Sequence, residues 1–172
     1  FNYINSARFS LCDGIGLIIA AKLHSININR YHGPDFFLDV INEGQNYSWS
    51  HYFLGGTQNV ISKLEAKILG KYPNVNIAGN YSPPFRKLTI EEERNMIADI
   101  NKKKPNFLWI SLGLPKQELW IMKYKKQLDV NFCIGVGAAF DFHAENIKRA
   151  PYIFQKIGLE WLYRVYYEPR LI

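Results

Sequence analysis

Cysteine is scarce in this chain, which has only Cys12 and Cys133 among its 172 residues. Two cysteines cannot form the disulfide framework of a small secreted protein, and their spacing is not that of a metal site. The four histidines show no ligand spacing either, such as a pair one helical turn apart. Because both cysteines lie in apolar segments, we expect buried free thiols in a reducing compartment.

Long hydrophobic runs are also missing. The longest, residues 15–21, is interrupted by Gly16 and is too short to cross a bilayer. No segment has the pattern of a secretory signal. We therefore expect a protein that is soluble or lies on a membrane surface. The chain begins at Phe1 without a methionine, which suggests a fragment or a trimmed chain.

The composition is otherwise that of a folded domain. Apolar residues make up 48% and aromatic residues 15%, which argues against a disordered chain, and the length fits one domain. The formal charge of +6 favours an anionic partner such as a phosphorylated substrate, an anionic membrane surface or nucleic acid. Solubility alone explains the same charge equally well.

Apolar strands alternate with helices from Ser50 onward. This alternation predicts right-handed βαβ units and an α/β fold: a single Rossmann-like domain with a mainly parallel sheet flanked by helices. A ligand crevice is expected at the carboxyl ends of the strands. The expected strands are residues 52–54, 75–78, 107–112 and 130–134, ending at Gly55, Gly79, Gly113 and Gly135.

Helix boundaries follow from caps and from periodic apolar residues. Thr89 with Glu92 forms a capping-box pattern, which predicts that a helix begins there. Gly44 is expected to stop an earlier helix. Before residue 80, helices are expected at residues 15–23, 36–41 and 60–72. Gly44 is the expected stop of the helix at residues 36–41.

The turn from Gly113 to Trp120 places a glycine, a proline and three polar side chains between an expected strand and an expected helix. Pro115 suits a first helical turn, where its missing N–H costs nothing. Lys116, Gln117 and Glu118 then lie beside unpaired backbone N–H groups at the positive end of the helix dipole. This arrangement is typical of an anion site at a sheet edge, although a capped helix with solvated polar residues has the same pattern.

Six groups of motifs occur in a fixed order along the chain. Each is weak alone, but in this order they resemble the WecG/TagA/CpsF glycosyltransferases (glycosyltransferase family 26), over nearly the whole chain. The motifs are Cys12-Asp13-Gly14-Ile15-Gly16, Arg30-Tyr31-His32-Gly33-Pro34-Asp35, Phe53-Leu54-Gly55-Gly56, Pro115-Lys116-Gln117-Glu118, residues 134–141, and a C-terminal group of residues 149–151, 158–164 and 168–170.

The resemblance implies one glycosyltransferase domain over residues 1–172, without the extreme N-terminal segment and the C-terminal tail of the family. It implies an inverting, metal-independent enzyme without a cofactor. Such an enzyme moves an N-acetylmannosamine-type sugar, or its uronate, from a UDP-sugar to a polyprenyl-diphosphate-linked N-acetylglucosamine, in bacterial cell-surface polysaccharide or teichoic acid synthesis. The implied location is cytoplasmic and peripheral, on the inner face of the cell membrane. Whether the protein forms a homo-oligomer is left undecided, and nucleic acid is not an expected partner.

Asp13 has two interpretations. Beside Gly14 and before an apolar helix, it fits a helix N-cap. The resemblance implies the general base instead, and the chemistry needs one, because a sugar hydroxyl is a poor nucleophile until a carboxylate takes its proton. Cys12 stands where the family usually has alanine, a small change that should not displace the carboxylate.

A departing nucleotide diphosphate carries negative charge that the enzyme must offset. The sequence has no Asp-x-Asp motif, with which many glycosyltransferases hold a metal ion. Basic side chains and helix N-termini are then expected to supply the positive charge. Arg30 is implied to contact diphosphate, although it also fits a solvated residue. Asp35, implied to shape the acceptor cleft, also fits a helix cap.

The resemblance also implies the remaining substrate contacts. Asp141 is implied to accept a hydrogen bond from uracil or ribose, although a structural cap fits the spacing equally well. Residues 80–85 keep only the final Phe of a Gly-Tyr-Phe segment of the family, so that base stacking falls to Tyr81 or Phe85. The other implied substrate-binding residues are Gly55, Gly56, Pro115, Lys116, Gln117, Glu118, Gly135, Gly137, Phe140, Arg149, Glu160 and Arg164.

Alternatives remain for several of these residues. Gly135 and Gly137 lack the third glycine of a dinucleotide fingerprint, which argues against NAD binding. Glu160 and Arg164, four residues apart, also fit a surface ion pair. A non-catalytic nucleotide-sugar-binding or assembly subunit is the main rival function. A nucleic-acid-binding domain ranks last, because interleaved basic and aromatic recognition signatures are missing.

Overall fold

The computed structural model describes residues 5–156 and 159–167. The chain divides into two compact units. The first unit comprises Phe1–Ser10 and Gly33–Asn146, and the second comprises Leu11–His32 and Ile147–Ile172. A single domain over residues 1–172 stays a prediction, because a division by contacts does not test whether the two units fold together.

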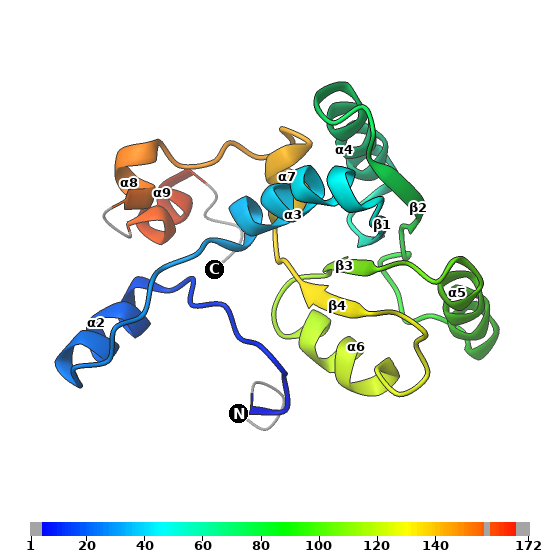
Figure 1. Ribbon diagram of the computed structural model, residues 1–172, viewed down its shortest axis with the longest axis horizontal. Coiled ribbons are helices and arrows are strands. Elements are labelled where there is room, and N and C mark those ends of the chain that lie inside the picture. Colours follow the sequence, from blue (N-terminus) through cyan, green and yellow to red (C-terminus); the bar gives the residue numbers. More distant parts are fainter. Residues whose placement is uncertain (1–4, 157–158, 168–172) are drawn as a thin grey trace. The chain divides into compact units, whose positions relative to one another are not determined.

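The first unit is an α/β structure with helices on both faces of one sheet (Figure 1). All neighbouring strands are parallel, in the order β2-β1-β3-β4, which confirms the predicted fold class. The strands are β1 (Ser50–Gly55), β2 (Asn76–Tyr81), β3 (Phe107–Ser111) and β4 (Phe132–Gly135). The helices are α3 (Gly33–Tyr47), α4 (Gln58–Lys71), α5 (Ile90–Lys103), α6 (Lys116–Tyr124) and α7 (Ala139–His143).

Two hydrophobic layers hold this sheet. On one face, Phe53 and Trp109 pack with side chains of α3, α4 and α7. On the other face, Tyr52 and Leu108 pack with side chains of α5 and α6. Because β1 and β3 are buried on both faces, their sequences are continuous apolar runs rather than alternating ones. That is why the runs were recognisable as strands from the sequence.

Three of the four predicted glycine positions lie at or just beyond the carboxyl ends of strands. Gly55 is the last residue of β1 and pairs with Ser111, the last residue of β3. Gly135 ends β4, and Gly113 follows β3. The prediction for Gly79 is wrong, because β2 continues through it to Tyr81. A Cβ at Gly79 would approach the Tyr52 ring to 3.0 Å, so this glycine permits close packing inside the strand.

The predicted helix over residues 36–41 is longer in the structure. Helix α3 begins at Gly33 and continues past Gly44 to Tyr47, so Gly44 does not stop it. Gly44 is buried, and a Cβ there would lie 2.9 Å from Nε2 of His51. The glycine therefore serves the close approach of α3 to β1. Strand β4 covers Phe132–Gly135 rather than the predicted residues 130–134.

The second unit contains α2 (Ile15–Leu23), α8 (Tyr152–Lys156) and α9 (Glu160–Tyr167). Helix α2 has the predicted bounds and ends in a Schellman-type turn, in which the Ile26 N–H donates to the Ala21 carbonyl at 2.8 Å. Ser25 takes the left-handed conformation that glycine usually supplies there, with φ 57°. The chain then returns, and the Tyr31 N–H donates to the Cys12 carbonyl at 3.0 Å.

Across the described parts of both units, no helix is long and apolar enough to cross a bilayer.

Candidate functional site

The carboxyl edge of the sheet in the first unit is the first candidate site. The chain order makes β1 and β3 neighbours whose following helices go to opposite faces, which is where α/β sheets commonly bind ligands. Gly55 and Gly56 have φ angles of 118° and 68°. A Cβ on Gly55 would overlap the Ser111 carbonyl, so only glycine fits this turn. The bare backbone leaves room for a ligand to approach.

Helix α4 begins directly after this glycine pair. Thr57 is its N-cap, and the Thr57 side chain accepts a hydrogen bond from the Val60 N–H at 3.3 Å. Ser82, which follows β2, donates its hydroxyl to the Gly56 carbonyl at 2.8 Å and so fixes the turn. The positive end of the α4 dipole therefore lies at the sheet edge, where it suits a phosphate group.

Helix α6 begins at the same edge but is organised differently. Gln117 is buried, its Oε1 accepts from the Gly137 N–H at 3.0 Å, and its Nε2 donates to Oε1 of Glu118 at 2.9 Å. Gly135 lets Gln117 pack closely, because a Cβ there would lie 2.7 Å from Nε2 of Gln117 and would displace its amide group. Gln117 thus braces the turn after β4. The Glu118 carboxylate adds negative charge here, so the start of α4 suits a phosphate group better than the start of α6 does.

The second carboxylate oxygen of Glu118 takes no part in this arrangement. Its Oε2 is buried and has no hydrogen-bond partner among the described residues. A buried acceptor of this kind favours a hydroxyl or N–H donor and disfavours phosphate. Pro115 and Lys116 are exposed beside it.

The remaining predicted residues of the first unit have diverse surroundings. Phe140 is fully buried and packs against Phe53 with ring centroids 5.6 Å apart, so its ring belongs to the core. Asp141 is half-buried, and its Oδ1 accepts from Nδ2 of Asn146 at 2.8 Å. Asp35 lies in the first turn of α3. The two candidates for base stacking differ, because Tyr81 ends β2 at the sheet edge whereas Phe85 is 96% exposed.

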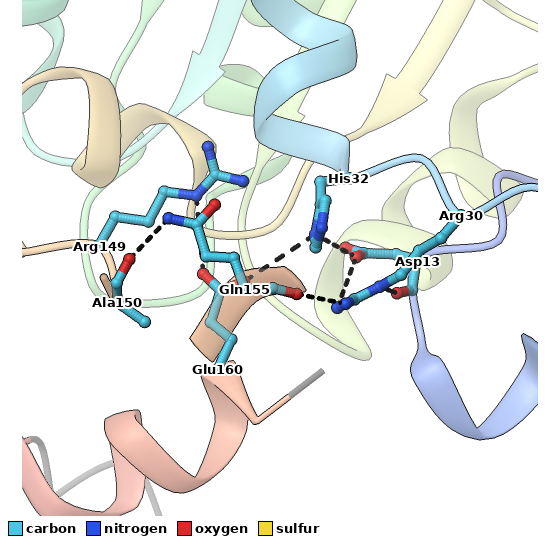
Figure 2. A network of polar contacts seen from close by, with 7 residues as sticks. All are labelled: Asp13, Arg30, His32, Arg149, Ala150, Gln155 and Glu160. Carbon is cyan, nitrogen blue, oxygen red and sulfur yellow. Dashed lines mark hydrogen bonds and ion pairs between the residues drawn. The ribbon is translucent and has the colours of Figure 1, made fainter. Parts of the chain in front are cut away.

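A network of charged side chains in the second unit is the second candidate site (Figure 2). Arg30 donates from Nε to the Asp13 carbonyl at 2.5 Å and from Nη1 to the Gln155 carbonyl at 2.7 Å. Its Nη2 lies 3.9 Å from Oδ1 of Asp13. Arg30 is therefore largely buried and engaged rather than merely solvated.

His32 connects the two carboxylates of this network. Its Nδ1 lies 3.0 Å from Oδ1 of Asp13 and 3.9 Å from Oε2 of Glu160. The other Glu160 oxygen lies 3.7 Å from Nε of Arg149. The structure thus brings together four residues that the sequence singled out, namely Asp13, Arg30, Arg149 and Glu160. The Arg164 side chain lies outside the described residues, as does its expected pair with Glu160.

The network distinguishes Asp13 from its neighbours. The Asp13 side chain is 54% exposed, whereas those of His32 and Glu160 are 17% and 16% exposed. Asp13 does not cap α2, because Gly14 is the N-cap and no side-chain cap bond is present. Two carboxylates and two guanidinium groups balance in charge, and the accessible carboxylate is the one suited to accept a proton from a ligand.

Comparison with known proteins covers both units. The family model for glycosyl transferases of the WecG/TagA/CpsF type matches residues 1–172. The chain belongs to this family.

Members of the family from several bacteria are similar to the chain. An N-acetylglucosaminyldiphosphoundecaprenol N-acetyl-beta-D-mannosaminyltransferase from Bacillus subtilis (strain 168) is 31% identical over 171 residues, covering 98% of this chain and 64% of the relative. Proteins of the same name from Bacillus spizizenii and Staphylococcus aureus (strain NCTC 8325) are each 30% identical. They match 96% and 94% of this chain, which spans 63% and 62% of their lengths.

The sequence of this WecG/TagA/CpsF family member did not single out two residues of the network, His32 and Gln155. His32 lies inside the Arg30–Asp35 motif, but a single histidine in a loop gives no signal without its partner. Gln155 contributes through its carbonyl, which any residue type offers. Over the residues described in both units, no group of three or more His, Cys, Asp or Glu side chains could hold a metal ion.

Proposed function

We propose that this chain catalyses an inverting transfer of an N-acetylmannosamine-type sugar, or its uronate, from a UDP-sugar to a polyprenyl-diphosphate-linked N-acetylglucosamine. The observation that carries the proposal is the match to relatives named as N-acetyl-beta-D-mannosaminyltransferases, at 30–31% identity over 94–98% of this chain. Cell-surface polysaccharide or teichoic acid synthesis is the proposed setting.

The donor is proposed to bind at the carboxyl edge of the sheet. The diphosphate would lie at the Gly55-Gly56 turn and the start of α4, where backbone N–H groups and the helix dipole favour negative charge. Glu118 would accept a hydrogen bond from a hydroxyl of the donor. Asp141 and Tyr81 are the proposed contacts for the nucleoside.

Asp13 is the proposed general base for the acceptor. Its carboxylate would take the proton from the acceptor hydroxyl as the hydroxyl oxygen bonds to the anomeric carbon. The bond from that carbon to UDP breaks in the same displacement, and UDP leaves with the electron pair, which inverts the anomeric centre. Arg30 and Arg149 supply positive charge in the same network for an anionic acceptor.

A polyprenyl-linked acceptor is held in a lipid bilayer. We therefore propose that the protein works as a peripheral protein on the inner face of the bacterial cell membrane. The formal charge of +6 suits an anionic lipid surface.

Asp13→Asn tests the proposed base, because asparagine keeps the size of the side chain but accepts no proton. Turnover is expected to fall by roughly 10²- to 10⁴-fold, the usual range for loss of a general base. Affinity for UDP and the melting temperature are expected to hardly change, because Asp13 is proposed to serve the acceptor. Transfer to a lipid-linked acceptor, calorimetric titration with UDP, and thermal melting measure the three quantities.

Asp129→Asn is the matched control, since Asp129 is an exposed carboxylate paired with Lys104 at 2.7 Å and belongs to neither site. This control should keep wild-type turnover. A fully active Asp13→Asn variant would move the base to another carboxylate, with Asp35 the next candidate. A wild-type protein that binds UDP-sugar but transfers nothing would instead favour a non-catalytic binding or assembly subunit.

A further inference from the structure

Asp13 is held through one of its two carboxylate oxygens. Nδ1 of His32 lies 3.0 Å from Oδ1, and Nη2 of Arg30 lies 3.9 Å from the same atom. Among the described residues, no hydrogen bond or ion pair engages Oδ2. The Asp13 side chain is 54% exposed, whereas that of His32, which lies against Oδ1, is 17% exposed.

The chemistry of the two side chains determines which of them can carry a hydrogen between them. An ionised carboxylate has no hydrogen to give, so a hydrogen bond across the 3.0 Å between these two atoms requires the hydrogen to be on Nδ1 of His32. A neutral His32 in this contact is consequently the Nδ1–H tautomer, which leaves Nε2 without a hydrogen. Nδ1 also lies 3.9 Å from Glu160, a second carboxylate that favours a hydrogen on the same nitrogen.

We propose that His32 is a positioning residue for Asp13: its imidazole holds Oδ1, fixes the carboxylate plane, and so keeps Oδ2 directed at the acceptor hydroxyl. The inference rests on the proposed function, in which Asp13 is the base. His32 does not touch the substrate in this role. Its effect passes through the 3.0 Å contact to Asp13.

His32→Gln and His32→Ala separate positioning from folding. Glutamine offers an amide N–H donor, so its kcat at pH 8 is expected within about tenfold of wild type, since one neutral donor to the carboxylate replaces another. Alanine removes the donor, and its kcat should fall further, towards roughly 10²-fold, with KM for the UDP-sugar unchanged.

His24→Gln is the matched control, because His24 is an exposed histidine of the same unit that follows α2. Its kcat and its KM for the UDP-sugar should match those of wild type. If His32→Gln and His32→Ala both retain the wild-type kcat, the inference is overturned.

A second measurement does not depend on turnover. Nitrogen-15 chemical shifts of the four histidines at pH 8, assigned with His32→Gln, should report the Nδ1–H tautomer for His32 in wild type and a shift towards Nε2–H in Asp13→Ala. An unchanged tautomer in Asp13→Ala would overturn the pairing. A wild-type protein that transfers no sugar counts against the proposed function, whereas the tautomer still decides whether Asp13 and His32 act as a pair.

Discussion

His51 is a buried histidine in the sheet of the first unit. Its Nδ1 accepts a hydrogen bond from Nε1–H of Trp109 at 3.1 Å, and its ring stacks on Phe107. Its Nε2 has no partner among the described residues and is close to Gly44. The ring is fully buried, and this burial lowers the pKa of His51 from 6.5 to about 4. His51 is therefore a neutral core residue and not a candidate for acid–base chemistry.

The shifted pKa of His51 predicts a dependence of stability on pH. The unfolded chain binds a proton at His51 below about pH 6.5, whereas the folded chain resists it until about pH 4. The His51 contribution is therefore complete above pH 6.5 and is lost as the pH falls from 6.5 to 4. At about 1.4 kcal/mol per pKa unit, the loss in unfolding free energy approaches about 3 kcal/mol.

Urea denaturation of wild type and His51→Gln at pH 7.5, 6 and 4.5 measures this effect. Glutamine keeps an acceptor for Trp109 but does not titrate, so its unfolding free energy should depend less on pH. The difference between the two proteins isolates His51 from other titrating groups. Parallel pH dependences would show that the buried ring is not responsible. His24→Gln, at an exposed histidine, should leave the slope unchanged.

The two cysteines behave as the sequence predicted in one respect. Both are free, with no disulfide between them. Burial raises the pKa of Cys133 to about 12, so its thiol stays protonated and unreactive at neutral pH. Both residues are half-buried as whole residues, which is less than the full burial that was expected.

At the scale of elements, the start of α5 combines two kinds of contact. The Thr89 hydroxyl accepts from the Glu92 N–H at 3.2 Å, and the Glu92 carboxylate accepts from the Thr89 N–H at 2.8 Å, which confirms the capping box predicted from the sequence. Arg86 also binds both Glu92 oxygens at 2.7 Å. The hydrogen bond from Arg86, followed by that from Thr89, lowers the pKa of Glu92 to about 2.

Thr89→Ala should lower the unfolding free energy by about 1 kcal/mol, the usual cost of losing an N-cap side chain. Thr89→Ser keeps the hydroxyl and should retain most of the stability. Thermal or urea denaturation of the three proteins at neutral pH measures both changes. Equal stability of the alanine and serine variants would mean that the hydroxyl does not cap α5 in solution.

At the scale of the whole molecule, the proposed phosphate site uses backbone N–H groups and the α4 dipole for positive charge. We expect UDP to bind with the same affinity in the presence of EDTA and of magnesium, because the start of α4 offers N–H groups and the sequence has no Asp-x-Asp motif. Calorimetric titration under both conditions measures this. Loss of UDP affinity in EDTA, restored by magnesium, would contradict the proposal.

Much of the fold was predictable because its signals are local. The capping box, the bounds of α2 and the apolar runs of β1 and β3 each depend on neighbouring residues or on a short period. Two of the errors concern glycines. Gly44 and Gly79 have the sequence pattern of a helix stop and a strand end, but each serves contact with a residue distant in the sequence, His51 and Tyr52 respectively. A local pattern cannot distinguish the two roles of glycine.

For the candidate site, too, some features followed from the sequence and others only from the tertiary structure. The sequence by itself determined the family, the α/β class and most of the residues of interest, because motif order and hydrophobic period survive without knowledge of contacts. Only the tertiary structure decided what those residues touch: it turned Gln117 inward as a brace, buried Phe140 in the core, and joined Asp13 to His32. The physical reason is that hydrogen bonds and ion pairs depend on distances of about 3 to 4 Å between side chains, and distances between residues far apart in a chain are set by the fold alone.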